Sequence, residues 1–158
     1  MKIIQQASYN YNDVDLQQRE YLYQGFVKVE KVQLSHRLFE SKEYIPPIQR
    51  ELIARRPAAG VLIYNDQQQK FALIEQFRIG ALDDTDSPWQ LEIIAGVLDG
   101  DESPEHCIRR EALEESGCEI QGLQHLYSFY PSAGACSELF HLYVAQAELP
   151  EHGGVHGM

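Results

Sequence analysis

The stretch RREALEESG, residues 109–117, places three glutamates in the last turns of a predicted helix. A residue advances by roughly 100° around a helix, so Glu111 and Glu115 lie one turn apart on the same face. Like charges at this spacing repel each other and destabilise an isolated helix. These carboxylates therefore need a neutralising partner.

The boundaries of this helix follow from the residues that flank it. Ser103 is a good N-cap residue and Pro104 suits the first helical position. Gly117 can end the helix in a left-handed conformation. The sequence therefore predicts one helix from about Pro104 to Ser116.

One side of the predicted helix carries the residues expected to face the core, Pro104, Ile108 and Ala112. Glu115 projects onto the same stripe, and Glu111 lies at its edge. Burying an unpaired carboxylate costs several kcal/mol or forces its protonation. The helix contains no lysine that could neutralise these carboxylates.

Two interpretations of the acidic helix are open. A solvated surface is the usual explanation for adjacent glutamates. The core-facing position of Glu115 instead favours a hard cation with oxygen ligands, Mg²⁺ or Mn²⁺. The turn at Ala95–Gly96, where a predicted strand ends, can add a backbone carbonyl to such a site.

Apolar periodicity predicts strands on both sides of the helix. They cover about residues 21–34 with a bend at Gly25, and then 49–56, 58–64, 70–76, 89–97, 123–130 and 139–146. The segments 58–64 and 70–76 should form a hairpin around the turn Asn65–Asp66. The order of strands, helix and strands predicts an α+β sandwich rather than a parallel doubly wound sheet.

Length and composition limit the classes of protein to which this chain can belong. The chain has 158 residues, 44% of them hydrophobic, which suits one globular domain with an extension. No apolar run approaches the ~20 residues that span a bilayer. Residues 1–15 are polar and unpatterned, which predicts a mobile or loosely paired leader, and they lack signal-peptide features. We therefore expect a cytoplasmic protein that does not bind membranes. The net charge of −11 argues against binding nucleic acid.

The chain has three cysteines, which show no metal-binding spacing. Their odd number and the absence of a secretion signal argue against a disulfide framework. We expect Cys107, Cys118 and Cys136 to be small buried hydrophobic residues.

A family resemblance rests on the acidic helix and the segment before it. Gly96, five residues, Glu102, seven residues and then REALEESGC (110–118) resemble the Nudix box of the Nudix hydrolases. The segment differs from the family pattern at Cys118, where an aliphatic residue is usual. The segments EQFRIGALDDTDSPWQLEIIAG, PSAGACSE and LYQGF are similar to the bacterial ADP-ribose pyrophosphatase branch, although a loop that usually reads SPGG is SAGA here.

The resemblance implies a fold and a domain organisation. The fold would be a Nudix α/β/α sandwich with a mixed sheet, plus an N-terminal β-rich, domain-swapping region. We expect residues 1–50 to form a dimerisation region and residues 51–158 the catalytic domain of a homodimer. Relatives continue with an acidic loop that supplies a catalytic glutamate, so the C-terminal part of the catalytic domain is expected to be missing.

The resemblance also implies catalytic and metal-binding roles. Glu111, Glu115 and the Ala95 carbonyl would hold Mg²⁺ or Mn²⁺. Glu114 and Glu115 would act in catalysis through the metal or its bound water, and Arg110 would orient the carboxylates. Such ions neutralise a pyrophosphate and lower the pKa of an attacking water. The implied reaction is hydrolysis of ADP-ribose to AMP and ribose 5-phosphate.

Substrate-binding residues are expected outside the box. The Arg78 guanidinium can donate two hydrogen bonds to a phosphate, or it can form a salt bridge at the rim of the site. Arg50 and Phe26 resemble the family residues that hold adenine, in some members from the other subunit, although an aromatic residue in a strand pattern is also often core. The residues expected to line the ribose side are Ser132, Gly134 and Glu138.

Alternatives remain for the function and for one residue. The box specifies diphosphate chemistry but neither base nor sugar, so another nucleoside diphosphate sugar such as GDP-mannose is a possible substrate. Because the catalytic glutamate of the missing loop has no counterpart, a non-catalytic nucleotide-sugar-binding module is the alternative from another class. Glu102 either supports the helix by a salt bridge or is a plain surface glutamate.

Overall fold

The computed structural model describes residues 7–156, and these residues form two compact units. The first unit comprises the described residues up to Arg55, together with residues 132–137. The second unit comprises residues 56–131 and the described residues from Glu138 onward. The acidic helix belongs to the second unit.

The predicted leader, residues 1–15, is only partly described, because residues 1–6 lie outside the described part of the chain. Tyr11–Asp13 form a 3₁₀ turn, and the first strand begins directly after it at Val14. A capping box anchored by the Asn10 side chain orders this turn. Of the two predicted alternatives, a mobile or a loosely paired leader, the second half of this segment is therefore the paired one, since Val14 and Asp15 pair with His36 and Ser35.

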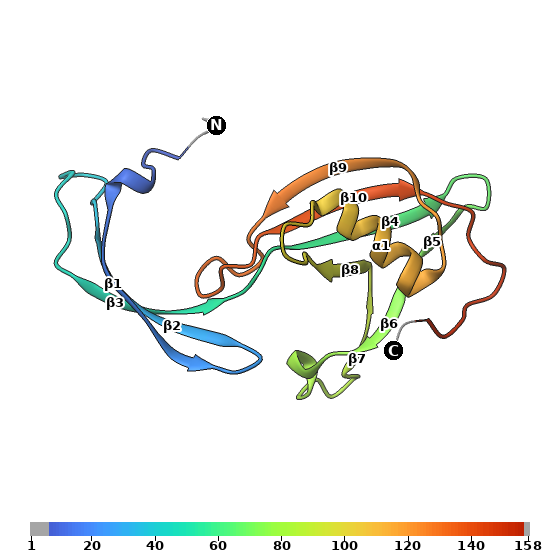
Figure 1. The fold of residues 1–158 in the computed structure, drawn as a ribbon, viewed down its shortest axis with the longest axis horizontal. Coiled ribbons are helices and arrows are strands. Elements are labelled where there is room, and N and C mark those ends of the chain that lie inside the picture. Colours follow the sequence, from blue (N-terminus) through green and yellow to red (C-terminus); the bar gives the residue numbers. More distant parts are fainter. Residues whose placement is uncertain (1–6, 157–158) are drawn as a thin grey trace. The chain divides into compact units, whose positions relative to one another are not determined.

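The first unit contains a three-stranded antiparallel sheet made of β1 (Val14–Gln24), β2 (Lys28–His36) and β3 (Ile48–Ala54), in that order (Figure 1). The predicted bend at Gly25 is the turn that separates β1 from β2. Residues 132–137 pair with the end of β3, where the Ile53 N–H donates to the Ala135 carbonyl at 2.7 Å. The expected β-rich N-terminal region is therefore present.

The second unit contains a five-stranded mixed sheet with β4 (Ala58–Asn65) in a central position. One neighbour, β10 (Phe140–Gln146), runs parallel to β4 and is flanked by the antiparallel β9 (Gln121–Phe129). The other side of β4 pairs antiparallel with β5 (Lys70–Ala72) and β8 (Ile94–Val97). This mixture confirms the predicted α+β class and mixed sheet.

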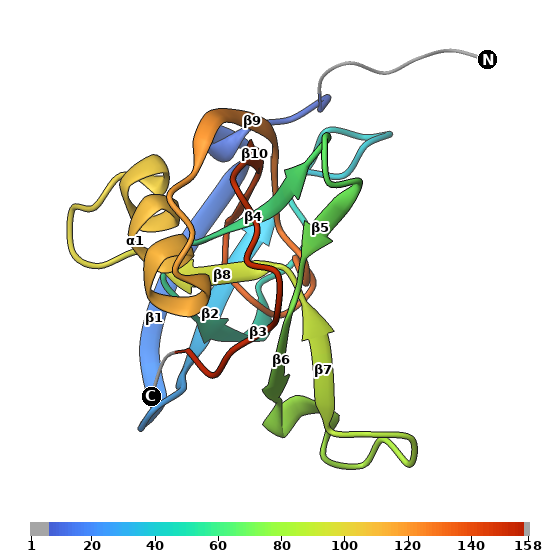
Figure 2. The same cartoon turned by 90° about the vertical axis from the view of Figure 1, so that its right-hand side faces the viewer.

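Two predicted strands are each divided in the structure. The segment 70–76 breaks at Leu73 into β5 and β6 (Ile74–Phe77), and 89–97 breaks at Ile93 into β7 (Trp89–Glu92) and β8. β5 and β8 pair with β4, whereas β6 and β7 pair with each other and form a separate two-stranded arm (Figure 2). The predicted hairpin between β4 and β5 is confirmed.

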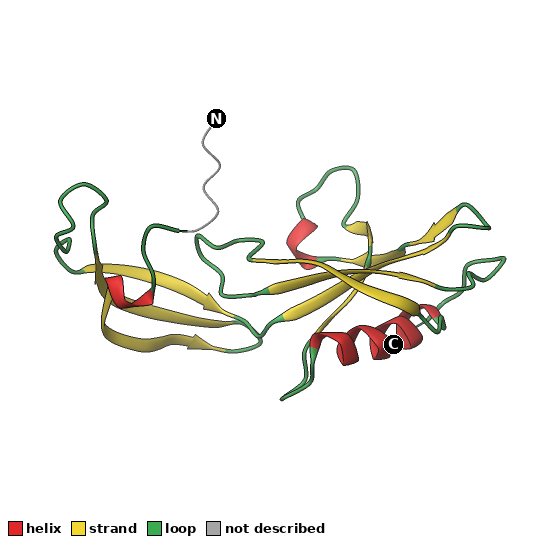
Figure 3. Cartoon of the chain, turned by 90° about the horizontal axis from the view of Figure 1, so that it is seen from above, coloured by secondary structure: helices red, strands yellow, loops and turns green. Residues whose placement is uncertain are grey.

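The helix α1 spans Pro104–Ser116, as predicted, and lies against one face of the sheet (Figure 3). Ile108 and Ala112 of its predicted stripe are buried in a core shared with β4, β8 and β10, whereas Pro104 is half-buried. α1 is the one α-helix within residues 7–156, and no helix there is long and apolar enough to cross a membrane. The core residues with no exposed surface are Ala59, Val61, Ile63, Ile94, Cys107, Ile108 and Ala112.

The caps of α1 have the predicted geometry. The Ser103 hydroxyl accepts a hydrogen bond from the His106 N–H at 3.2 Å, and Gly117 has a left-handed φ of 68°. We expect Ser103→Ala to lower the free energy of unfolding by about 1 kcal/mol, because a helix N–H loses its acceptor. Urea unfolding measures this loss. Ser103→Asp retains an acceptor and should remain near wild type, and equal losses in both variants would contradict the capping role.

Candidate active site

The charged side chains of α1 are organised around Arg110. Its guanidinium donates to both Glu102 oxygens, at 3.2 and 3.1 Å, to Glu111 Oε1 at 2.8 Å and to Glu114 Oε2 at 3.1 Å. The contact with Glu114 joins side chains one helical turn apart, at i and i+4, and the contact with Glu102 is the salt bridge that was one of its two predicted alternatives. Arg110 thus brings three carboxylates together, and its hydrogen bonds to Glu102 are the main cause that raises its own pKa.

Glu102 links the turn before α1 to the helix. Its side chain is 7% exposed and accepts hydrogen bonds from Arg110 and from the Asp99 N–H, the latter at 3.1 Å. The bonds from Arg110, followed by the Asp99 N–H, lower the pKa of Glu102 from 4.5 to about 2. Glu102 is therefore a structural partner of Arg110 rather than a plain surface residue.

This lowered pKa predicts a pH-dependent effect of Glu102→Gln. A carboxyl that ionises more easily when folded stabilises the fold above its unfolded pKa, near 4.5, and stops doing so as the pH falls towards about 2. The variant should therefore be less stable than wild type at neutral pH, and the difference should shrink between these two values. Urea unfolding over a pH series measures it, and a difference that does not vary with pH would contradict the assignment.

Glu111 lies against the backbone of β8. A β-carbon on Gly96 would stand 1.9 Å from Glu111 Oε1, so glycine is needed for the carboxylate to occupy this place. The Glu111 side chain is 14% exposed, and this burial raises its pKa against the opposing hydrogen bond from Arg110. Ala95, whose carbonyl is a predicted ligand, precedes Gly96 and pairs with Gly60 of β4.

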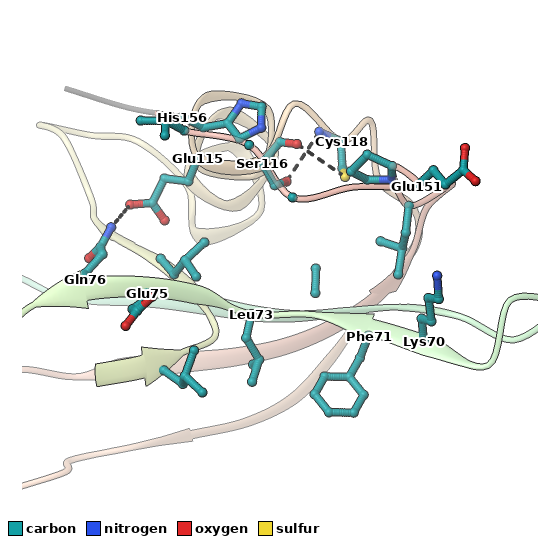
Figure 4. Close-up of a pocket in the computed structure, with 18 of the residues that line it drawn as sticks. Lys70, Phe71, Leu73, Glu75, Gln76, Glu115, Ser116, Cys118, Glu151 and His156 are labelled. Atoms are coloured by element: carbon teal, nitrogen blue, oxygen red, sulfur yellow. Dashed lines mark hydrogen bonds between the residues drawn. The ribbon is translucent and has the colours of Figure 1, made fainter. Parts of the chain in front are cut away.

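Glu115 lines a cleft of about 840 Å³ at the end of α1 (Figure 4). Its Oε1 accepts a hydrogen bond from Gln76 Nε2 at 2.8 Å. Its Oε2 is buried and has no hydrogen-bond partner among the described residues. The prediction that Glu115 turns toward the interior is therefore correct, and one carboxylate oxygen there lacks compensation.

The chemistry of these carboxylates suits a magnesium-type cation. Within residues 7–156, no three His, Cys, Asp or Glu side chains converge in the manner of a closed metal site. Mg²⁺ does not require one, because it commonly binds one or two carboxylates and keeps several waters. The buried Glu115 oxygen without a hydrogen-bond partner is one position where a divalent cation would supply the missing partner, and the Glu111 carboxylate, 14% exposed, is a second oxygen ligand one helical turn away.

Arg78 follows β6 and forms a bidentate ion pair with Glu92 of β7. Its Nε lies 3.0 Å from Glu92 Oε1, and its Nη2 lies 2.6 Å from Glu92 Oε2. The hydrogen bond to Glu92 is the main cause that raises the pKa of Arg78, with a further contribution from the charge of Glu115. The salt bridge, which was one of the two predicted alternatives, is therefore present in this structure.

The other predicted substrate residues divide between the units. Phe26 and Arg50 lie in the first unit, and Phe26 is 99% exposed, so its interpretation as a core residue was wrong. Arg50 lies on β3, where its guanidinium donates to the Gln49 carbonyl at 2.8 Å. Ser132 and Gly134 also belong to the first unit, whereas Glu138 and the box carboxylates belong to the second.

All three cysteines are free thiols, and two of them have the predicted burial. Cys107 and Cys118 are buried, whereas Cys136 is half-buried. Burial is the main cause that raises the pKa of Cys107 to about 12, so this thiol stays protonated at neutral pH and is a packing residue.

Sequence reasoning missed Gln76 and Glu92. The available signal was the strand period of two, which places Gln76 and Arg78 on one face of the same segment. The strand period could not show that Gln76 forms a hydrogen bond with Glu115, which is 39 positions away in the chain.

The chain is similar in sequence to known proteins. A family model described as the NUDIX domain matches residues 54–154. An ADP-ribose pyrophosphatase of Escherichia coli (strain K12) is 35% identical over 152 residues, covering 96% of this chain and 72% of that protein. One from Haemophilus influenzae is 32% identical over 153 residues, covering 95% and 70%.

Two further proteins are similar to this chain, one with a different named substrate and one with a solved structure. A GDP-mannose pyrophosphatase of Citrobacter koseri is 41% identical over 98 residues, covering 61% of this chain and 51% of that protein. A crystal structure of an ADP compounds hydrolase shares the fold, with a TM-score of 0.66 at 21% identity over 93% of this chain and 75% of that one. The matched domain, the acidic helix and these relatives show that the chain belongs to the Nudix hydrolase family, in its bacterial ADP-ribose pyrophosphatase branch.

Proposed function

We propose that this Nudix protein hydrolyses the pyrophosphate bond of ADP-ribose, or of a related ADP-sugar, to AMP and ribose 5-phosphate with the help of Mg²⁺ or Mn²⁺. The observation that carries the proposal is the buried, unpartnered Glu115 oxygen at the edge of a cleft. The named activities of the relatives from E. coli and H. influenzae support the choice of substrate.

The residues that would hold the cation are Glu111, Glu115 and the Ala95 carbonyl. When bound, a divalent cation neutralises the diphosphate and lowers the pKa of a bound water. Arg110 reduces the repulsion between the Glu111 and Glu114 carboxylates, because its guanidinium donates a hydrogen bond to each of them. The Glu114 side chain is 56% exposed, so it can accept a proton from water in the site.

Binding of substrate would use the cleft and the expected residues outside the box. The cleft volume of about 840 Å³ is within the range of small-molecule sites. Arg78 would have to exchange its contact with Glu92 for one with a phosphate. We also propose roles for Arg50 and Phe26 at the base, and the ribose-side residues would be Ser132, Gly134 and Glu138.

Assembly and location complete the proposal. Residues 1–50 would serve as the dimerisation region of a homodimer, and residues 51–158 as its catalytic part. The cytoplasm is the proposed location. Size-exclusion chromatography with light scattering tests the oligomeric state, and a monomer at micromolar concentration would contradict the dimer.

A second candidate is hydrolysis of GDP-mannose, favoured by the 41% identity over 98 residues to the enzyme of C. koseri. The test is a side-by-side assay of ADP-ribose and GDP-mannose with Mg²⁺, with AMP and GMP measured by chromatography. Faster AMP release supports the proposal, and faster GMP release supports the alternative. Binding of ADP-ribose without product would instead support the non-catalytic binding module.

A further inference from the structure

We propose that Gln76 is a positioning residue that fixes the Glu115 carboxylate for cation binding. Gln76 lies on β6, outside the Nudix box, and its Nε2 donates to Glu115 Oε1 at 2.8 Å (Figure 4). This inference deepens the proposed function and rests on it, because it assigns the support of one expected metal ligand.

A neutral donor has a different effect on a carboxylate from that of a cation. An amide N–H occupies one oxygen and restricts the side chain without cancelling its charge. Arg110 differs in this respect, since it brings a positive charge to Glu111 and Glu114 as well as hydrogen bonds. Gln76 therefore brings no positive charge to Glu115, and Oε2 has no hydrogen-bond partner among the described residues, so this oxygen remains available for a cation.

The position of Gln76 is set independently of α1. Gln76 stands opposite Gln90 in the β6–β7 ladder, so the backbone of the arm determines where its amide lies. The side chain then bridges from this arm to the last turn of the helix. A donor held by a different element can fix the orientation of Glu115 even where the helix end is free to move.

Metal ligands depend on such outer partners, whose loss typically lowers metal affinity by about 10–100-fold. We expect this loss of Mn²⁺ affinity in Gln76→Met, which keeps the length of the side chain but removes the donor. Gln76→Asn should give the same loss, because its amide is one methylene too short, while its polarity protects the fold.

The test is direct titration of the substrate-free 158-residue protein with Mn²⁺, in which the electron paramagnetic resonance signal measures the free ion. The matched control is Gln90→Met, which removes the same amide from the paired position in the arm. Gln90 donates to the Ser87 carbonyl at 2.6 Å and not to Glu115, so its loss should leave Mn²⁺ affinity near wild type. Thermal unfolding in the presence of a chelator reports any structural damage separately.

Each result has one meaning. Weakened Mn²⁺ binding in both Gln76 variants, with normal binding in Gln90→Met, supports the positioning role. Wild-type affinity in the Gln76 variants, or an equal loss in the control, overturns it while leaving the metal site intact. Absence of Mn²⁺ binding in the wild type overturns the metal site itself, and with it the metal dependence of the proposed function.

Discussion

Glu115→Gln is expected to reduce AMP release from ADP-ribose by about 10³-fold or more, because several kcal/mol of charge stabilisation depend on the metal site. The glutamine keeps the shape of the side chain and can still accept the hydrogen bond from Gln76. What it loses is the negative charge on a buried oxygen that has no partner among the described residues. The loss of turnover should therefore not result from unfolding.

The same change should raise the stability of the metal-free protein. An unsatisfied buried polar group costs about 1–3 kcal/mol, and more when it is charged, so a neutral amide at this position should raise the free energy of unfolding by about 1 kcal/mol. Turnover and urea unfolding in the presence of a chelator measure the two effects. The control is Glu105→Gln, an exposed glutamate in the first turn of the same helix. Near wild-type turnover in Glu115→Gln would contradict a catalytic metal helix.

Gly96→Ala is expected to lower turnover by about 10–100-fold, the range found when the support of a metal ligand is disturbed. The backbone at Gly96 is not in the left-handed region, so alanine is permitted there by conformation. Its β-carbon would nevertheless occupy the place of the Glu111 carboxylate. Because Glu111 is a flexible side chain, it should move aside while the fold survives.

The measurement is turnover together with Mn²⁺ affinity and the free energy of unfolding. We expect the first two to fall while the third changes by less than about 1 kcal/mol, as for a tolerated substitution. Gly80→Ala is the matched control, since a β-carbon at Gly80 meets nothing within 4 Å. Full activity in Gly96→Ala would show that the position of Glu111 against β8 is not needed for catalysis.

The parts of this site that could be predicted from sequence are those that depend on local geometry. The bounds of α1 follow from Ser103, Pro104 and Gly117, and the Arg110–Glu114 contact follows from helical spacing. Both depend on residues at most four positions apart, for which the backbone geometry is nearly fixed.

The parts that could not be predicted depend on pairing between distant segments. The period-two pattern continues through Leu73 and Ile93, although the strands change partner at those residues. A change of partner is a property of the sheet and leaves no mark in the local pattern. For the same reason the contact between Gln76 and Glu115 could be seen only in the folded chain.

The placement of the glutamates at the end of α1 has a consequence for helix dynamics. The C-terminal end of a helix carries partial negative charge, so each carboxylate there opposes the macrodipole by about 0.3–1 kcal/mol. The last turn of α1 contains no basic residue, and Gly117 ends it directly. That turn is therefore the segment of α1 most prone to fray, and a bound cation would be what closes it. Amide hydrogen exchange at residues 113–117 would then report occupancy of the site in the absence of any substrate.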